Sequence, residues 1–244
     1  MPHHVTSSRN GRLVAYGVYG TREVGLIDTR TDTITRIPVS QKSGDMHSHA
    51  PFLSRDGRTV YVTNELRSGT TQLIGTVSAV DLGTGDIWCE LDVGVRPSEV
   101  VVTRDGKRGY VSVRNELVIK EIDFTSCALT GRSVNIGEQV DTLDLQPNEK
   151  SLSAGLRGPA PLPSRVAVVN LVSFETADVR FWTIPGGTLT GHQWTSANGR
   201  FTYAAFEGEG AGVALIDHKT GVVLKLPPTG GRPHGIDVTG PCGR

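Results

Sequence analysis

Short runs of apolar residues recur along the whole chain, and turn-forming residues separate them. Val24–Asp28 and Val77–Asp81 are examples, each only five residues long and rich in β-branched and aliphatic side chains. Runs this short, bounded by Gly, Asn and Asp, predict β-strands rather than helices. No stretch has a convincing helical periodicity. The pattern therefore predicts an all-β protein.

A tight turn with an Asn-Gly or Asp-Gly pair recurs between these runs. Both pairs tolerate the positive φ that hairpin turns require, so each turn is expected to join two antiparallel strands. The copies are Ser8–Arg12, Ser54–Arg58, Thr103–Lys107 and Ser196–Arg200, with Gln146–Lys150 in the same place without its glycine. An aromatic residue follows in four copies, at Tyr16, Tyr61, Tyr110 and Tyr203, and we expect these rings to pack between repeats.

A second strand pattern ends in Asp or Asn and marks the repeat length. Its last residues are Asp28, Asp81, Asp123, Asn170 and Asp217, spaced 53, 42, 47 and 47 residues apart. A short acceptor at this point is typical of an Asx turn, so the four aspartates are expected to be structural. A polar turn and a fourth strand, such as Ile34–Val39, complete each unit.

Each unit thus contains four short strands, and such a sheet cannot bury both faces alone. Radial stacking of similar sheets solves this problem, and the result is a β-propeller. A β-sandwich is the alternative, but it does not require five similar units. We predict one β-propeller domain over residues 1–244. Its repeats are 3–42, 46–94, 95–137, 138–188 and 189–230, and 231–244 begins a sixth with an inner strand.

The second repeat also carries a family resemblance. Tyr61-Val62-Thr63-Asn64 is the word for which the YVTN β-propeller repeat family is named, and the flanking Ser54–Tyr61 and Val77–Asp81 segments are similar to its first three strands. The resemblance extends over essentially the whole chain and implies a WD40-like propeller. The family and its relatives include surface-layer proteins, cofactor-enzyme subunits and lactonase-like enzymes, so it implies no single function.

The number of repeats leaves three interpretations open. Relatives of this family usually have seven blades, so the chain is either a fragment of a longer ring, a compact five-bladed ring or part of an assembly with a second copy. An open ring would expose the apolar faces of its end blades, which predicts self-association.

The composition of the chain limits the classes of partner and the compartment to be expected. Lys and Arg number 25 and Asp and Glu number 25, so the net charge is zero and nucleic acid is not expected as a partner. No apolar run is long enough for a membrane helix. No export signal is visible, which favours the cytoplasm, although relatives are often exported. Cys89, Cys127 and Cys242 are odd in number and far apart, so a Cys89–Cys127 disulfide is not favoured.

Histidines concentrate at the start of the predicted innermost strands. Six of the seven occupy this slot, and Glu99 and Asp141 occupy it in the other two repeats. Neutral imidazoles beside carboxylates can hold a transition metal or act as general acid and base. The slot contains His4, His49, Glu99, Asp141, His192 and His234, and His47 with His49 is the strongest metal candidate. The structural alternative is that each imidazole bonds a neighbouring blade's backbone. No other cofactor is evident.

Arginines recur in the loops between the second and third strands, on the same predicted face. Arg22, Arg67, Arg114 and Arg157 hold similar positions in four consecutive repeats. Guanidinium groups suit carboxylate or phosphate, which predicts an anionic ligand. The alternative is that they are solvated charges paired with Glu65, Glu116 and Glu207. Insertions at Leu66–Gly75 and Arg157–Ser164 are expected to form long loops that select a partner.

Two functions follow from this arrangement. The first is a rigid scaffold that binds a protein or small ligand at its loop face. The alternative is an enzyme, either a metal-assisted hydrolase or lyase or a redox cofactor-associated subunit, that uses the histidine-rich mouth. The enzyme hypothesis predicts that His4, His49, His192 and His234 point into one cavity near Glu99 or Asp141. No complete catalytic set maps onto the chain.

Overall fold

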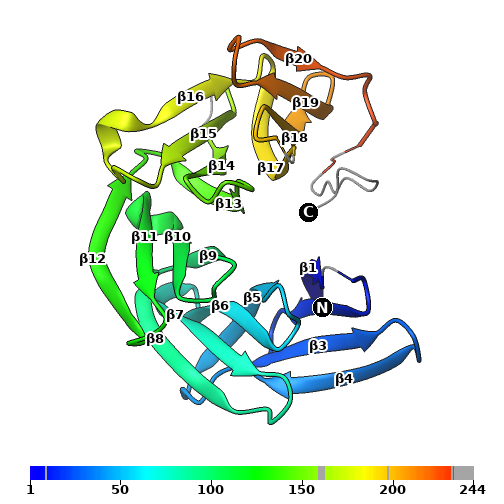
Figure 1. The fold of residues 1–244 in the computed structure, drawn as a ribbon, viewed down its shortest axis with the longest axis vertical. Coiled ribbons are helices and arrows are strands. Elements are labelled where there is room, and N and C mark those ends of the chain that lie inside the picture. Colours follow the sequence, from blue (N-terminus) through cyan, green and yellow to red (C-terminus); the bar gives the residue numbers. More distant parts are fainter. Residues whose placement is uncertain (9, 159–162, 197, 232, 234–244) are drawn as a thin grey trace. The chain divides into compact units, whose positions relative to one another are not determined.

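The computed structural model describes residues 1–8, 10–158, 163–196, 198–231 and 233. In these residues, twenty strands form five four-stranded antiparallel sheets in which consecutive strands are neighbours (Figure 1). Two single 3-10 turns, Arg114–Glu116 and Thr176–Asp178, are the helical elements of this part of the chain. The fold is an all-β β-propeller with four-stranded blades, as predicted. Among the described residues, no helix has the length and apolar character to span a membrane.

The strand bounds follow the predicted repeats to within a few residues. The first two blades are β1 (Pro2–Ser7), β2 (Leu13–Val18), β3 (Glu23–Asp28), β4 (Thr33–Pro38), β5 (Asp45–Leu53), β6 (Thr59–Ser68), β7 (Thr71–Asp81) and β8 (Ile87–Val95). The third is β9 (Pro97–Val102), β10 (Arg108–Val113), β11 (Val118–Asp123) and β12 (Ala128–Asn135). The last two are β13 (Gln139–Leu145), β14 (Ser151–Arg157), β15 (Arg165–Asn170), β16 (Arg180–Thr183), β17 (Gly187–Thr195), β18 (Phe201–Gly208), β19 (Gly212–Asp217) and β20 (Val223–Lys225).

The chain divides into two compact units. The first unit is Met1–Glu116 with Lys120–Arg132, and the second unit is Leu117–Ile119 with Ser133–Arg244. The first unit holds the first two blades and most of the third, and the second unit holds the last two. The predicted sixth inner strand falls almost wholly outside the described residues, and His234 lies there too.

The recurring turns form as the sequence predicts. The Asn or Asp side chain accepts a hydrogen bond from the amide two residues later, as in Arg12 N to Asn10 Oδ1 at 3.0 Å and Arg58 N to Asp56 Oδ1 at 3.1 Å. The fourth copy keeps this bond, from Lys150 N to Asn148 Oδ1 at 2.8 Å. Its Glu149 takes the positive φ of 54° that glycine adopts in the other copies. The turn geometry therefore survives the loss of its glycine.

The aspartates that end the third strands form the expected Asx turns. Asp28 Oδ1 accepts from Arg30 N at 2.9 Å, and Asp217 Oδ1 accepts from Lys219 N at 2.9 Å. Asp81 and Asp123 make the same bond. These carboxylates are structural, as predicted.

Apolar contacts between neighbouring sheets make the core of each unit. In the first unit, Val24 and Leu26 of β3 pack with Val60 and Val80 of the second blade. In the second unit, Val166 and Ile184 pack against Phe206 and Ile216. Burial of each such side chain stabilises the fold by roughly 1.5–3 kcal/mol. Tyr61 also lies between blades, with its ring 4.7 Å from Phe124, as expected.

A disulfide joins Cys89 to Cys127, and the prediction that disfavoured it was wrong. Cys89 lies in β8 and Cys127 in the turn before β12, and their Cα atoms are 5.6 Å apart. Stacking of successive blades brings their outer strands together, so a separation of 38 residues becomes a short distance in space. The odd cysteine count and the long separation carried no information about this contact.

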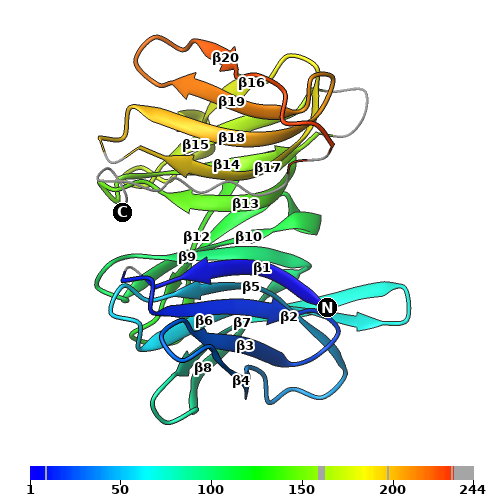
Figure 2. The ribbon, with the colours of Figure 1, turned by 90° about the vertical axis from the view of Figure 1, so that its right-hand side faces the viewer.

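The insertion at Leu66–Gly75 is a strand extension rather than a loop. β6 and β7 remain paired as far as Ser68 and Thr71, and Gly69 turns the chain with a φ of 59°. This hairpin extends beyond the neighbouring strands of the first unit (Figure 2). The predicted insertion at Arg157–Ser164 lies partly outside the described residues.

Candidate functional site

The predicted slot coincides with a β-bulge in the first strand of every blade. The pairing register shifts around His4 in β1, at His49–Ala50 in β5 and at Asp141 in β13. The same shift occurs at Ser98–Glu99 in β9 and at Gly191–His192 in β17. A bulge leaves a residue outside the regular alternation and redirects its side chain, and bulges are frequent beside functional sites. The repeated slot is therefore a repeated backbone feature.

In the first unit, three imidazoles from this slot form a cluster. The ring centroids of His3, His4 and His49 lie 4.5–4.6 Å from one another. One ring nitrogen from each lies within 4.8 Å of the others. His49 is buried, whereas His3 and His4 are half-buried. Nitrogen donors gathered at this spacing are chemically suited to hold one transition metal ion.

His49 also holds two neighbouring blades together. Its Nδ1 donates to the carbonyl oxygen of Ser98 at 2.7 Å, and Thr63 Oγ1 donates to the same oxygen at 2.8 Å. Burial lowers the pKa of His49 well below its usual value, and the nearby Arg114 and His3 lower it further. The imidazole is therefore neutral at pH 7. This bond is the backbone contact that the structural interpretation expects.

Tyr19 links the histidines to a charged cluster. Its ring centroid lies 5.3 Å from His3 and 4.8 Å from His47. Its hydroxyl donates to Glu65 Oε2 at 3.1 Å and accepts from Arg67. Burial, followed by the Glu65 charge, raises the pKa of Tyr19. His47 lies beside Asp45, with Nε2 3.0 Å from Oδ1, and is not in the three-histidine cluster.

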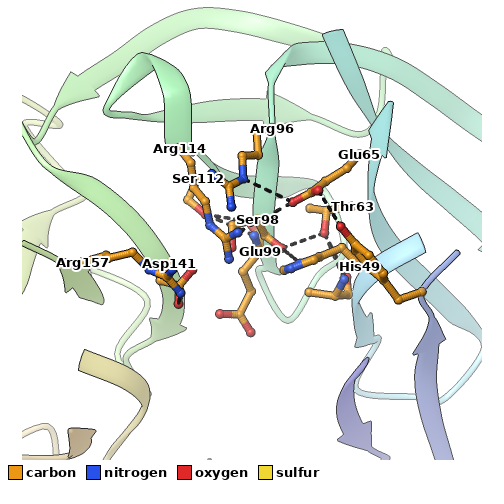
Figure 3. A network of polar contacts seen from close by, with 12 residues as sticks. His49, Thr63, Glu65, Arg96, Ser98, Glu99, Ser112, Arg114, Asp141 and Arg157 are labelled. Carbon is orange, nitrogen blue, oxygen red and sulfur yellow. Dashed lines mark hydrogen bonds and ion pairs between the residues drawn. The ribbon is translucent and has the colours of Figure 1, made fainter. Parts of the chain in front are cut away.

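Three arginines converge on the buried carboxylate of Glu65, and Figure 3 shows Arg96 and Arg114 beside it. The nitrogen–oxygen distances are 2.8 Å from Arg67, 3.8 Å from Arg96 and 3.7 Å from Arg114. The Glu65 side chain is 1% exposed, and those of Arg67 and Arg96 are 28% and 30% exposed. One carboxylate thus faces three permanent positive charges. Of the three arginines, Arg67 and Arg96 are the two whose side chains reach solvent, each about one third exposed.

Arg96 has two further unusual features. Its backbone φ is 61°, which is uncommon for a residue other than glycine, and its carbonyl accepts from Arg114 N at 3.1 Å. Its Nε is buried and donates no hydrogen bond. A buried N–H group without a hydrogen-bond acceptor and a strained backbone are both features that occur at functional sites.

The predicted arginines separate into different environments. Arg67 and Arg114 join the Glu65 cluster, whereas Arg22 is on the surface and donates to the carbonyl of Lys42 at 2.7 Å. Arg157 belongs to the second unit and lies 3.4 Å from Asp141 Oδ2. Sequence reasoning missed Arg96 because it searched only the loops between second and third strands. The signal available was the position of Arg96 just before the slot in the third repeat.

In the second unit, neutral polar groups make the corresponding contact between innermost strands. Thr142 Oγ1 bonds to the Gly191 carbonyl oxygen at 2.8 Å and to Gln193 Oε1 at 2.7 Å. Gln193 Nε2 donates to the carbonyl oxygens of Thr142 and Ser153 at 3.2 and 3.0 Å. Trp194 is buried, with its ring 5.9 Å from Tyr203. His192 belongs to this unit, so a single histidine cavity remains a prediction.

The second unit also has a shallow groove away from the slot. Its volume is about 410 Å³, and Lys150, Asp178, Arg180, Trp182 and His218 are among the residues that line it. The His218 ring lies edge-on to Trp182 at 5.0 Å and its Nε2 lies 2.8 Å from Thr202 Oγ1. No sequence pattern predicted this groove.

Comparison with solved structures identifies the fold. A chain of Kuenenia stuttgartiensis hydrazine synthase has a TM-score of 0.79 and 21% identity, with 96% of this chain and 69% of that chain covered. A chain of the mitotic checkpoint complex has a TM-score of 0.72 and 12% identity, with 94% of this chain and 64% of that chain covered. This chain therefore spans about two thirds of each. At such low identity, the likeness concerns the fold alone.

No family model and no curated protein matches the sequence.

Proposed function

We propose that the chain is a YVTN-type β-propeller that acts as a rigid binding scaffold for a small anion bearing a carboxylate or phosphate group. The site is the charged cluster of the first unit, formed by Arg67, Arg96 and Arg114 around Glu65. The single observation that carries the proposal is the convergence of three guanidinium groups on one buried carboxylate. An incoming anion would meet the two guanidinium groups that reach solvent, those of Arg67 and Arg96.

The chemistry of arginine favours such a ligand. A guanidinium group presents several N–H donors in a planar fork that matches carboxylate and phosphate oxygens. Arg67 and Arg96 are each about one third exposed, so they reach solvent while they remain paired with the buried Glu65 carboxylate. Because the anchoring strands belong to a stacked β-scaffold, little conformational entropy would be lost on binding.

A purely structural cluster elsewhere in the first unit provides the contrast. Glu121 is 2% exposed and faces Arg108 at 3.5 Å and Arg132 at 3.3 Å. Thr130 also donates to its carboxylate at 3.0 Å. That cluster has two arginines and no histidines, and each of the two carboxylates also accepts from a hydroxyl, of Thr130 at Glu121 and of Tyr19 at Glu65. The Glu65 cluster has a third arginine and a positive φ at Arg96, and these differences favour a ligand there.

The contacts of the YVTN motif, Tyr61–Asn64, are consistent with the proposed family. Tyr61 packs against the next blade, Thr63 bonds to that blade's backbone, and Asn64 Nδ2 donates to Thr76 and Ser78 within its own blade. All four residues from Tyr61 to Asn64 are buried. The word therefore describes how one blade is sealed to the next, which supports a shared repeat but specifies no ligand.

Titration calorimetry with inorganic phosphate and with succinate tests the proposal. We expect saturable binding of at least one of them to the unmodified chain and a loss of at least about ten-fold in Arg67→Gln or Arg96→Gln, because charged hydrogen bonds contribute ~1.5–3 kcal/mol. Arg132→Gln is the matched control, since it removes an equivalent charge beside Glu121. Equal affinity in Arg96→Gln and Arg132→Gln would exclude the site.

A protein partner and an enzyme remain the other two candidates. The mitotic checkpoint complex is by its title an assembly, which favours protein partners for propellers of this fold. A partner carrying an acidic segment would use the same arginines. The enzymatic candidate depends on the histidine cluster, because three imidazoles could hold a metal beside an Arg-bound anion.

A further inference from the structure

We propose that His3, His4 and His49 form a binding site for a divalent transition metal ion such as Zn²⁺ or Co²⁺. The three ligand nitrogens already lie within 4.8 Å of one another, and all three residues belong to the first unit. Zn–N bonds are about 2.0–2.1 Å long, so small rotations of the rings would complete a three-nitrogen set. Such a set leaves a fourth position for water or an anion.

The backbone of β1 explains how two consecutive residues supply ligands to one site. In a regular strand, neighbouring side chains point to opposite faces. His4 is instead the extra residue of a bulge, because His3 pairs with Gly17 and Val5 pairs with Tyr16. Its φ of 43° is strained for histidine, and the bend places the two rings 4.6 Å apart. Backbone strain that gathers ligands is an observation independent of the ring cluster.

The contact of His49 with Ser98 prepares the third ligand. Because Nδ1 donates to the Ser98 carbonyl oxygen, Nε2 carries the lone pair and the ring orientation is fixed. An N–H of a metal-binding histidine donated to a backbone carbonyl is a common second partner in metal sites. The same bond that seals two blades therefore also selects the tautomer that binds metal.

A glycine on β2 keeps the strands that carry the ligands close together. A Cβ atom at Gly17 would lie 2.3 Å from the His49 carbonyl oxygen and 2.9 Å from that of His3. Any side chain at this position would push β1 and β5 away from β2. Gly17 is thus a positioning residue for His3 and His49, although it contributes no ligand atom.

The neighbouring charges determine what must accompany the metal. Arg114 and Arg96 both act electrostatically on His49, and each also faces Glu65, at 3.7 and 3.8 Å. A dication there would be repelled unless an anion entered with it, so we expect hydroxide, phosphate or a carboxylate in the fourth position. The proposed anion site would provide that partner, but the three imidazoles do not depend on it for their geometry.

Metal binding by untagged full-length protein tests the proposal. The protein is first stripped with a chelator and then titrated with Co²⁺, followed by the visible absorption of the bound ion, and with Zn²⁺ in competition with a chromophoric chelator. We expect one ion per chain. His4→Ala and His49→Gln should each weaken binding by at least about ten-fold, given the effect sizes known for metal-site residues. Circular dichroism verifies that each variant is folded.

His47→Ala is the matched control. His47 lies two residues from His49 but outside the three-histidine set, so its removal should leave the affinity unchanged. Absence of stoichiometric binding, retention of binding in His4→Ala or His49→Gln, or an equal loss in His47→Ala would each overturn the proposal. Should His49→Gln not fold, His3→Ala together with His4→Ala decides the question. Arg96→Gln separates the two proposals, because it should weaken anion binding by at least about ten-fold while retaining the metal ligands.

Discussion

The two units seal their blades in the same way but with different chemistry. In the first unit, Thr63 and His49 bond to the Ser98 carbonyl oxygen, and in the second, Thr142 bonds to the Gly191 carbonyl oxygen. Both contacts lie at the bulge of an innermost strand. In the second unit Gln193 completes a neutral network, whereas in the first unit imidazoles and guanidinium groups surround the contact.

This difference shows which polar groups the contact between blades requires and which it does not. A hydroxyl and an amide suffice to close the joint between blades in the second unit, so histidine is not required for that purpose. At the corresponding contact the first unit has imidazoles and three arginines around one buried carboxylate. We infer that these additional groups serve a ligand.

The largest effect is expected from Glu65→Gln. It leaves three arginines, one of them with a 7% exposed side chain, without their carboxylate, and breaking a buried ion pair costs ~3–5 kcal/mol. Urea denaturation should show this loss. Glu23→Gln is the control, because its pair with Arg36 is exposed and worth under about 1 kcal/mol. Equal stability of the two variants would mean that the cluster is solvated and uncoupled from the fold.

The next effect in size is expected from the Cys89–Cys127 disulfide, a feature of the first unit. A double Cys89→Ser and Cys127→Ser variant should lose roughly 2–4 kcal/mol of stability, because the bond restricts a loop of 38 residues in the unfolded chain. Reduction of the unmodified protein should lower its unfolding midpoint to that of the variant. An unchanged midpoint on reduction would show that the bond is absent in solution.

Gln193→Leu tests the neutral network of the second unit. It removes bonds to Thr142 and Ser153 and leaves buried polar atoms unpaired, which costs roughly 1–3 kcal/mol. Gln41→Leu, at an exposed position, is the control. The variant should not alter anion or metal binding. A loss of binding with retained stability would reverse the roles assigned to the two units.

The smallest effect concerns the pH dependence of the second unit. Burial lowers the pKa of His218 from its usual 6.5, and the nearby Arg180 lowers it further, whereas Asp217 raises it. The unfolded chain therefore binds a proton at a higher pH than the folded chain, and stability should fall as the pH drops below 6.5. His218→Gln should show a shallower decrease over this range in thermal melts. An identical slope would mean that His218 titrates normally.

Local patterns predicted the blades, because hairpin turns and Asx turns depend on residues close in sequence. Asn10 and Asp28 bond to amides two residues away, and the chain alone specifies such contacts. The disulfide and the Glu65 cluster depend on which strands face each other across blades. Arg96 and Arg67 lie 29 residues apart in the sequence, and no local rule pairs them.

The histidine slot was predictable only in part. Repetition in the sequence located it, but the reason that His3 and His4 can share one side is the bulge, which appears only in the register of β1 with β2. His47 was predicted as a ligand together with His49 because alternate residues can both reach the mouth where the chain is not yet a regular strand. The bulge follows His47, so His49 joins His3 and His4 while His47 faces Asp45.

A crystal of the protein soaked in selenate tests the central claim most directly, since selenium reveals an anion by its anomalous scattering. We predict the strongest anomalous peak within hydrogen-bonding distance of Arg67, Arg96 and Arg114. Anomalous peaks elsewhere on the molecule, with none beside these three arginines, would contradict it.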